Sequence, residues 1–400
     1  MELPLLIGCL LVIGGVAVIP LSAKIGAPVL LLFLGIGMLA GIDGPGGIGF
    51  ENFELALQIG SLALAIILFA GGLETSMAEI RKAAAPALVL ATIGVVITAV
   101  VVAAAAVYIM DFSLVMALML GAVVASTDAA ATFLLLRQSN ASLQGRLEET
   151  IVVESGLNDP MAIFLTVTMV SIVDAGQSLS WSLAPELLPD LAWQMVAGAA
   201  AGIGGGWLLA RFTDQIRIPS GLYMPLVLAG GLAVYAATSL VGGSAYLAVY
   251  LCGVAFRARV HMPLERIHHF HDGLAWLAQL VMFLMLGLLV TPHDLQLSYK
   301  GALLVALVLM FVARPLAVAL CLTPFRYSLK EQTFVGWVGL RGGVPIFLAI
   351  LPVVSPGPTT QQFFDIVFVI VVASLVLQGW TIPLVSKLLK VTDDGDKKAD

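Results

Sequence analysis

Charged side chains are scarce in this sequence. Asp, Glu, Lys and Arg make up 11% of its 400 residues, whereas a soluble domain carries about 25%. Apolar residues reach 60%, and apolar runs long enough to cross a bilayer core recur along the whole length. The composition therefore excludes an ordinary soluble domain and predicts an all-α polytopic membrane protein.

Other features are missing as well. The three cysteines, Cys9, Cys252 and Cys321, lie singly in apolar stretches, which is typical of small buried side chains rather than of disulfides or metal ligands. The sequence also lacks a basic patch interleaved with aromatic residues, which is the pattern that indicates nucleic-acid binding. The N-terminus carries Glu2 and lacks the basic start of a signal peptide, so we expect a retained helix.

The apolar runs predict thirteen transmembrane helices. Alternate loops, starting after the first run, hold nearly all of the loop Lys and Arg residues, and the opposite loops hold only Lys300. This asymmetry predicts an N-terminus outside the cell and a cytoplasmic C-terminus. The expected spans are 3–21, 26–42, 54–73, 83–109, 113–136, 147–173, 191–210, 220–240, 245–258, 273–291, 300–323, 332–352 and 362–389.

Five charged residues within these spans are expected at membrane depth: Asp128, Glu154, Asp159, Arg314 and Arg341. Each costs at least a few kcal/mol in a membrane unless it is paired or hydrated. Internal salt bridges alone do not account for the set, because two arginines cannot neutralise three carboxylates. One acid is left over, and it must be protonated or bind a cation.

The segment ESGLNDP at 154–160 concentrates polar side chains on one helix face. Glu154 and Asn158 are four residues apart, as are Ser155 and Asp159, so all four share that face. Pro160 leaves a backbone carbonyl one turn earlier without its helical partner. Such a carbonyl is tolerated at membrane depth only where it faces protein, water or an ion, which predicts a small hydrated site.

Two further polar interruptions occur in the fifth and twelfth expected spans. The first, VVASTDAAATFL, contains Ser126, Thr127, Asp128 and Thr132, whose oxygens could serve as ligands or could simply bond back to their own helix. The second is GLRGGVP at 339–345, where glycines permit unwinding. Paired broken helices are typical of inverted-repeat transporters, with the binding site where the breaks meet.

Four motifs together resemble the monovalent cation/proton antiporters: STD at 126–128, ESGLNDP at 154–160, ARP at 313–315 and GLRGG at 339–343. The match is to the branch with Asn-Asp in the sixth helix. STDAAATF followed by ESGLNDPMA is similar to bacterial potassium/proton antiporters of the CvrA or NhaP-like type. Where many relatives have proline after the Asp of the broken fifth helix, this chain has Ala129.

The resemblance implies an architecture. It implies a homodimer in the lipid bilayer of the bacterial inner membrane, with inverted repeats and two crossed discontinuous helices in each protomer. The expected parts are an antiporter domain at 1–390, with core spans at 83–173 and 300–389, scaffold or dimerisation spans at 3–73 and 220–291, a linker span at 191–210, and a polar cytoplasmic tail at 391–400. A regulatory domain could follow in a longer natural chain.

The resemblance also implies roles for ion-binding residues. Asp159 would carry the cation and the proton, with Thr127 and Ser155 as ligands beside it. Asp128 would help to place the broken helix, and Asn158 would organise the crossing.

The remaining implied roles are structural. Glu154 would pair with Arg314, while Arg341, next to Gly342 and Gly343, would sit at the second break and balance the helix ends. No cofactor, and no metal other than the transported ion, is implied.

Three function classes follow from these features. The first is antiport of K⁺, or alternatively Na⁺, against H⁺ by alternating access, with competition at Asp159; ligand types do not separate the two cations, and the resemblance favours K⁺. The second is a cation channel, which would require a symmetric filter. The third is an intramembrane enzyme with Ser155 as nucleophile, which lacks a base nearby.

The cluster HMPLERIHHFHDG at 261–273 is expected to be a cytoplasmic loop, either a pH sensor or an ordinary solvated turn.

Overall fold

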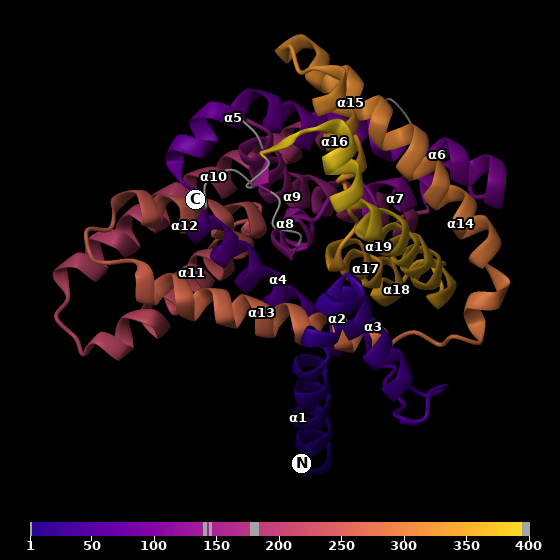
Figure 1. Ribbon diagram of the computed structural model, residues 1–400, viewed down its shortest axis with the longest axis horizontal. Coiled ribbons are helices and arrows are strands. Elements are labelled where there is room, and N and C mark those ends of the chain that lie inside the picture. Colours follow the sequence, from indigo (N-terminus) through magenta and orange to yellow (C-terminus); the bar gives the residue numbers. More distant parts are fainter. Residues whose placement is uncertain (1, 139–141, 144–145, 177–183, 394–400) are drawn as a thin grey trace, which may run out of the picture. The chain divides into compact units, whose positions relative to one another are not determined.

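The computed structural model describes residues 2–138, 142–143, 146–176 and 184–393 (Figure 1). The described chain is almost entirely helical, and its two strands, β1 (Ser142–Leu143) and β2 (Thr392–Asp393), form one short antiparallel pair. Nine helical segments of the described residues are long and apolar enough to cross a membrane. The chain is therefore an all-α multi-pass membrane protein.

A helix lies over each of the ranges expected to span the membrane. In the first half of the chain these are α1 (Glu2–Ala17), α2 (Ile19–Ile25), α3 (Val29–Ala40), α4 (Phe53–Glu74), α5 (Met77–Val89), η1 (Leu90–Gly94), α6 (Val95–Met110), α7 (Leu114–Val123), α8 (Ala129–Gln138), α9 (Leu147–Asp174) and α10 (Ala184–Gln215). The second half contains η3 (Ser220–Leu222), α11 (Tyr223–Leu240), α12 (Ala245–Arg259), α13 (Glu265–Leu288), η4 (Asp294–Leu297), α14 (Tyr299–Val308), η5 (Leu309–Ala313), α15 (Arg314–Leu322), η6 (Thr323–Phe325), α16 (Leu329–Trp337), α17 (Gly343–Leu348), α18 (Ile350–Val354) and α19 (Gln361–Leu389).

The helices group into two compact units. The first unit gathers the described residues of Met1–Leu57, Ala85–Ser178 and Leu280–Asp400, and the second those of Gln58–Ala84 and Leu179–Gln279. The long helices α4, α5 and α13 pass from one unit to the other. All the charged residues singled out inside spans belong to the first unit.

Two helical spans of the first unit are interrupted. Residues 124–128 separate α7 from α8, and residues 338–342 separate α16 from α17. The two breaks contact each other: the backbone N–H of Asp128 donates to the carbonyl of Leu340 at 2.8 Å, and the Thr132 hydroxyl donates to the carbonyl of Val338 at 3.1 Å. The second break thus supplies an acceptor to the first, and Thr132 of α8 supplies a donor to the second. Ala129 in place of proline does not prevent the first interruption.

Two long spans of the first unit contain a π-helical turn. One is η1, between α5 and α6, and the other is η5, between α14 and α15. Helix α6 packs on η5, and α15 packs on η1. A π-turn inserts one extra residue into an α-helix and is often found at functional sites, and here Arg314 follows η5 directly.

Helices α10, α11 and α12 pack together in the second unit. Three glycines spaced by four residues line α10 where it meets α12: a Cβ on Gly198 would lie 2.7 Å from the carbonyl oxygen of Ser244, and one on Gly202 would lie 2.5 Å from that of Ala248. A Cβ on Gly206 would overlap the carbonyl oxygen of Cys252. Small residues at this spacing let two helix backbones approach closely in a membrane.

The expectation of a loop over the histidine cluster was wrong for most of its length. Helix α13 begins at Glu265, so His268, His269 and His271 are helical. His271 is only 1% exposed, and its ring stacks edge-on against Phe69. The reason is periodicity: Ile267 and His271 lie four residues apart and share the buried face of the helix.

Candidate functional site

The centre of the site is a hydrogen bond between a broken helix and a continuous one. Asp159 lies midway along α9 and is 5% exposed. The hydroxyl of Ser126, in the break between α7 and α8, donates to Oδ1 of Asp159. The carboxylate is therefore held against the non-helical residues of the first break.

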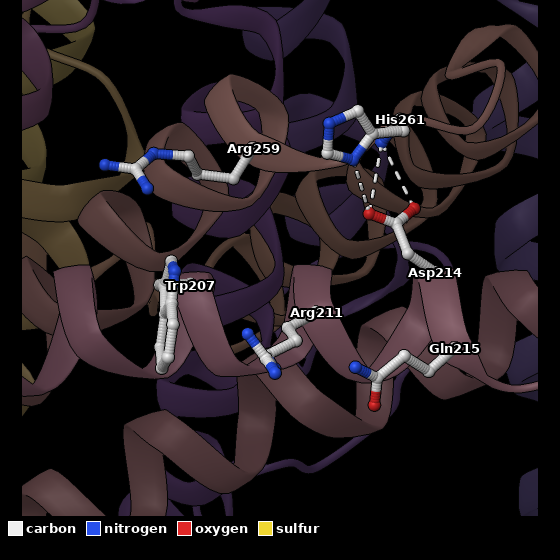
Figure 2. A pocket seen from close by; sticks show the side chains of 6 residues that line it. All are labelled: Trp207, Arg211, Asp214, Gln215, Arg259 and His261. Carbon is white, nitrogen blue, oxygen red and sulfur yellow. Dashed lines mark hydrogen bonds and ion pairs between the residues drawn. The ribbon is translucent and has the colours of Figure 1, made fainter.

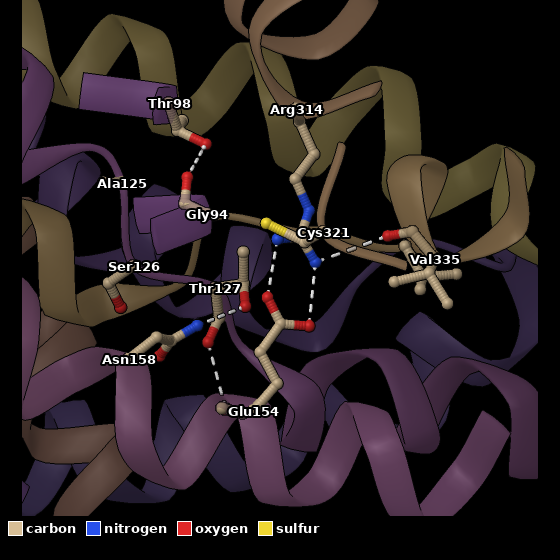
Figure 3. Close-up of polar contacts among 12 residues, drawn as sticks. Gly94, Thr98, Ala125, Ser126, Thr127, Glu154, Asn158, Arg314, Cys321 and Val335 are labelled. Carbon is tan, nitrogen blue, oxygen red and sulfur yellow. Dashed lines mark hydrogen bonds and ion pairs between the residues drawn. The ribbon is translucent and has the colours of Figure 1, made fainter. Parts of the chain in front are cut away.

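Two other residues of α9 also contact the same break, and Figure 3 shows one of them, Asn158, beside Thr127. The Asn158 side-chain amide donates to Oγ1 of Thr127 at 2.6 Å. The Ser155 hydroxyl donates to the carbonyl of Thr127 at 3.0 Å and accepts the backbone N–H of Ala129 at 3.2 Å. The buried Oδ1 of Asn158 has no hydrogen-bond partner among the described residues. A buried amide oxygen without a donor is a candidate acceptor for a cation.

Asp128 occupies a different position from the other predicted ligands. Its Oδ1 accepts the backbone N–H of Ala131 at 3.0 Å, as a helix N-cap residue does for the start of α8. Its Oδ2 lies so close to Gly342 that any Cβ there would overlap it. Asp128 thus positions the broken helix against the second break, and glycine at 342 is required by this close approach.

Arg341 connects the second break to the first. It is 1% exposed, and its Nη1 donates to the carbonyls of Ala125 and Ser126 at 2.7 and 2.6 Å. These carbonyls follow the C-terminal end of α7, where the helix dipole is negative and a cation is favourable. The arginine thereby fixes the backbone of the residue that bonds to Asp159.

Glu154 and Arg314 form a bidentate ion pair between α9 and α15 (Figure 3). Nη1 of the arginine lies 2.6 Å from Oε1 of the glutamate, and Nη2 lies 2.9 Å from Oε2. Both side chains are almost completely buried. Such pairs combine charge with fixed geometry, so the two helices are held in one register.

With these contacts assigned, the two fully buried acids of α9, Glu154 and Asp159, differ in their partners. Glu154 is neutralised by Arg314, and Arg341 faces backbone carbonyls. No ion pair found in the described part of the chain involves Asp159, whose described side-chain partner is the Ser126 hydroxyl. The charge count anticipated one leftover acid, whereas Asp128 and Asp159 both lack a basic partner among the described residues. Asp128 caps α8, and Asp159 is the more deeply buried of the two.

Several contributors were not selected from sequence. Ser126 belongs to the polar cluster of the fifth expected span, but Thr127 rather than Ser126 was expected to be the ligand beside Asp159. Ser374 accepts the backbone N–H of Arg341 at 3.1 Å and donates to Gln378 at 2.5 Å, and Gln378 donates to the carbonyl of Trp337 at 2.8 Å. The signal was available, because these two residues lie four apart in an otherwise apolar span.

Asp365 was also missed. It is a further buried acid, 2% exposed, in the first half of α19. Its position four residues into the last expected span is the signal that could have found it.

Comparison with known proteins finds relatives that match nearly the whole chain. The family model for the transmembrane part of sodium/hydrogen exchangers matches residues 10–388. The K⁺/H⁺ antiporter NhaP of Alkalimonas amylolytica is 45% identical over 388 residues, covering 97% of this chain and 67% of the relative. The K⁺/H⁺ antiporter NhaP2 of Shewanella sp. strain ANA-3 is 44% identical over 390 residues, covering 96% of this chain and 67% of the relative.

A solved structure is similar as well. The sodium/proton antiporter MjNhaP1 of Methanocaldococcus jannaschii superposes with a TM-score of 0.80 at 25% identity, covering 97% of this chain and 99% of that one. The resemblance stated from the four motifs is confirmed by these matches. The chain belongs to the sodium/hydrogen exchanger family of transmembrane cation/proton antiporters.

Proposed function

We propose that this protein exchanges K⁺ for H⁺ across the membrane, with both ions competing for Asp159. The observation that carries the proposal is a deeply buried carboxylate that has no basic partner among the described residues and lies against a helix break. A carboxylate in such a place is costly as a bare charge. It is neutralised either by a proton or by an alkali cation bound to the nearby oxygens.

The choice of K⁺ rests on the relatives. Two proteins at 44–45% identity are named as K⁺/H⁺ antiporters, whereas the more distant MjNhaP1 is named as a sodium/proton antiporter. Na⁺/H⁺ exchange at the same site is therefore the alternative. Oxygen ligands of the kinds present here accept both ions.

We assign the roles of the site as follows. Asp159 carries the ion, while Asn158, Thr127 and Ser155 supply or orient oxygens beside it, and Ser126 is added to this set because it contacts the carboxylate. Asp128 and Arg341 hold the two breaks together, with Gly342 and Gly343 allowing their close approach. Glu154 and Arg314 act as a structural pair.

The architecture proposed around this site follows the family. It has thirteen spans in inverted repeats, with the interrupted helices α7–α8 and α16–α17 crossing at their breaks. Spans 83–173 and 300–389 form a moving core, spans 3–73 and 220–291 a scaffold that dimerises, and span 191–210 the link between them. The N-terminus lies outside and the C-terminus in the cytoplasm of the bacterial inner membrane.

The coupling of the two fluxes follows from the cost of an unpaired buried charge. Asp159 crosses with a proton or with a cation, but not empty. Because a single carboxylate carries one positive charge in either direction and its neighbour Asn158 is neutral, exchange is one cation for one proton and electroneutral.

Transport in proteoliposomes containing a pH-sensitive dye tests the proposal. Addition of K⁺, Na⁺, Rb⁺ or Li⁺ outside should release internal protons, with K⁺ effective at the lowest concentration. A response to Na⁺ but not to K⁺ would replace the substrate and leave antiport intact. Exchange whose equilibrium position depends on membrane potential would contradict electroneutrality, and no proton movement with any cation would reject antiport.

A further inference from the structure

The second unit contains a pocket of about 300 Å³ at the end of α10 (Figure 2). It lies among the last two turns of α10, the end of α12 and the residues that follow α12, far along the chain from the residues of the ion site. Its lining residues are Trp207, Arg211, Asp214, Gln215, Arg259 and His261. Two arginines and a tryptophan around one opening suit an anionic ligand.

The one acid in the lining is already engaged. Asp214 accepts the backbone N–H of His261 at 3.1 Å and lies 2.8 Å from Nδ1 of the same residue. Figure 2 shows this pair to one side, with Arg211, Arg259 and Trp207 on the other. Within the described part of the chain, neither arginine forms an ion pair or a hydrogen bond. Both guanidinium groups are therefore available to an anion from outside the protein.

A stripe of exposed side chains leads along α10 to this pocket. Val196, Ala200, Ile203, Trp207 and Arg211 follow one another at intervals of three or four residues and are all exposed. Residues at this spacing lie on one helix face. The stripe changes from aliphatic to aromatic to cationic, as expected for a surface that passes from hydrocarbon through the interfacial region to the headgroups.

We propose that the pocket binds the phosphate of an anionic phospholipid. Arg211 and Arg259 contact the phosphate, since guanidinium groups bind phosphate oxygens in a bidentate manner. Trp207 lies beside the glycerol region, and an acyl chain lies along Ile203 and Val196. Basic pockets between transmembrane helices on the cytoplasmic side are suited to such headgroups. A zwitterionic lipid has the same phosphate but would bring a second cationic group close to the two guanidinium groups.

Native mass spectrometry of the purified full chain in detergent tests the proposal. The protein is incubated with dioleoyl phosphatidylglycerol or with dioleoyl phosphatidylcholine, and bound lipids are counted. We expect the parent to retain phosphatidylglycerol preferentially, and Arg211→Gln with Arg259→Gln together to lose that preference. Arg217→Gln, which removes an exposed arginine just beyond the pocket, is the matched control and should keep it. If the double variant does not elute as a folded species, each single variant should at least halve phosphatidylglycerol retention.

A second arm separates a lipid from a free anion. Inorganic phosphate at millimolar concentration is added to the parent before the lipid. We expect phosphatidylglycerol retention to be unchanged, because the stripe on α10 contributes to lipid binding only. Displacement of the lipid by phosphate would assign the pocket to a free anion and overturn the lipid proposal. Equal retention of the two lipids, or a preference that survives both substitutions, would overturn it as well.

Discussion

The hydroxyl of Ser126 donates to the carboxylate of Asp159, joining the break between α7 and α8 to the middle of α9. Because the hydroxyl donates, the contact stabilises the charged carboxylate, which is the form that binds a cation in the proposed mechanism. The serine itself is held by its backbone, since its carbonyl accepts from Arg341.

Ser126→Ala should therefore weaken apparent cation affinity. A hydrogen bond to a charged group contributes about 1.5–3 kcal/mol, which corresponds to roughly 10- to 150-fold. The measurement is the cation concentration for half-maximal dye response in proteoliposomes. Ser171→Ala, which removes an exposed hydroxyl bonded within α9, is the control. Equal affinities of the parent and Ser126→Ala would mean that this bond is broken when the cation binds.

Asp159→Asn should abolish exchange without unfolding the protein. The amide is close in shape to the protonated acid and carries no charge, so the site stays in its neutral state. Exchange is measured with the dye assay, and folding by the thermal transition in detergent. Asp174→Asn, at the exposed end of the same helix, should transport normally. Substantial exchange by a well-folded Asp159→Asn protein would refute the mechanism.

Apparent cation affinity should fall as the pH is lowered. A proton and a cation cannot occupy the same carboxylate, so at pH values where the site is mostly protonated each further unit should weaken binding about tenfold, or roughly 1.4 kcal/mol. Cation titrations at a series of pH values, with equal pH inside and outside at the start, give the slope. An affinity that does not change with pH would argue that the two ions use separate sites.

Breaking the ion pair between Glu154 and Arg314 should destabilise the protein. Removing one partner leaves a buried charge, at a cost of about 3–5 kcal/mol, so Glu154→Gln and Arg314→Ala should each lower the thermal transition in detergent and reduce transport. Glu331→Gln is the comparison, because its pair with Arg146 is partly exposed, and such pairs contribute about 0–1 kcal/mol. Both buried-pair variants remaining as stable as the parent would remove a structural role for the pair.

Gly342→Ala should impair both folding and transport. The new methyl group would overlap the Asp128 carboxylate, and neither the capped start of α8 nor the second break can move independently, since they share hydrogen bonds. Gly204→Ala, in α10 with open space around the added atom, should be neutral or slightly stabilising, as expected for alanine inside a helix. Indistinguishable melting temperatures for Gly342→Ala and the parent would show that the breaks separate easily.

The sequence was sufficient to select a candidate site but not to assign contacts within it. Charges inside apolar spans are so costly that their positions alone marked α9 and the two breaks. The residue that contacts Asp159 could not be predicted in this way. Residues 124–128 are not helical, so helical periodicity does not indicate whether Ser126, Thr127 or Asp128 faces α9. The fold directs the first to Asp159, the second to Asn158 and the third to its own helix.

In the histidine cluster, by contrast, a helical period was present in the sequence but a loop was expected. Its residues are polar enough to resemble a loop, yet the apolar positions among them follow a helical period, and packing against Phe69 accommodates His271.

The contacts of Ser374 and Gln378 with the second break join residues more than thirty positions apart in the chain. Such long-range contacts follow from tertiary packing rather than from local pattern.

The number of residues in the π-turn η5 determines the direction in which Arg314 points. Arg314 begins the α-helix directly after this turn, with Glu154 on the side it faces. One residue of α-helix corresponds to about 100° of rotation. Deleting a single residue from Leu309–Ala313 would leave Arg314 chemically intact but would turn its guanidinium away from the glutamate. Insertions and deletions in this segment are therefore constrained as strictly as substitutions at Arg314 itself.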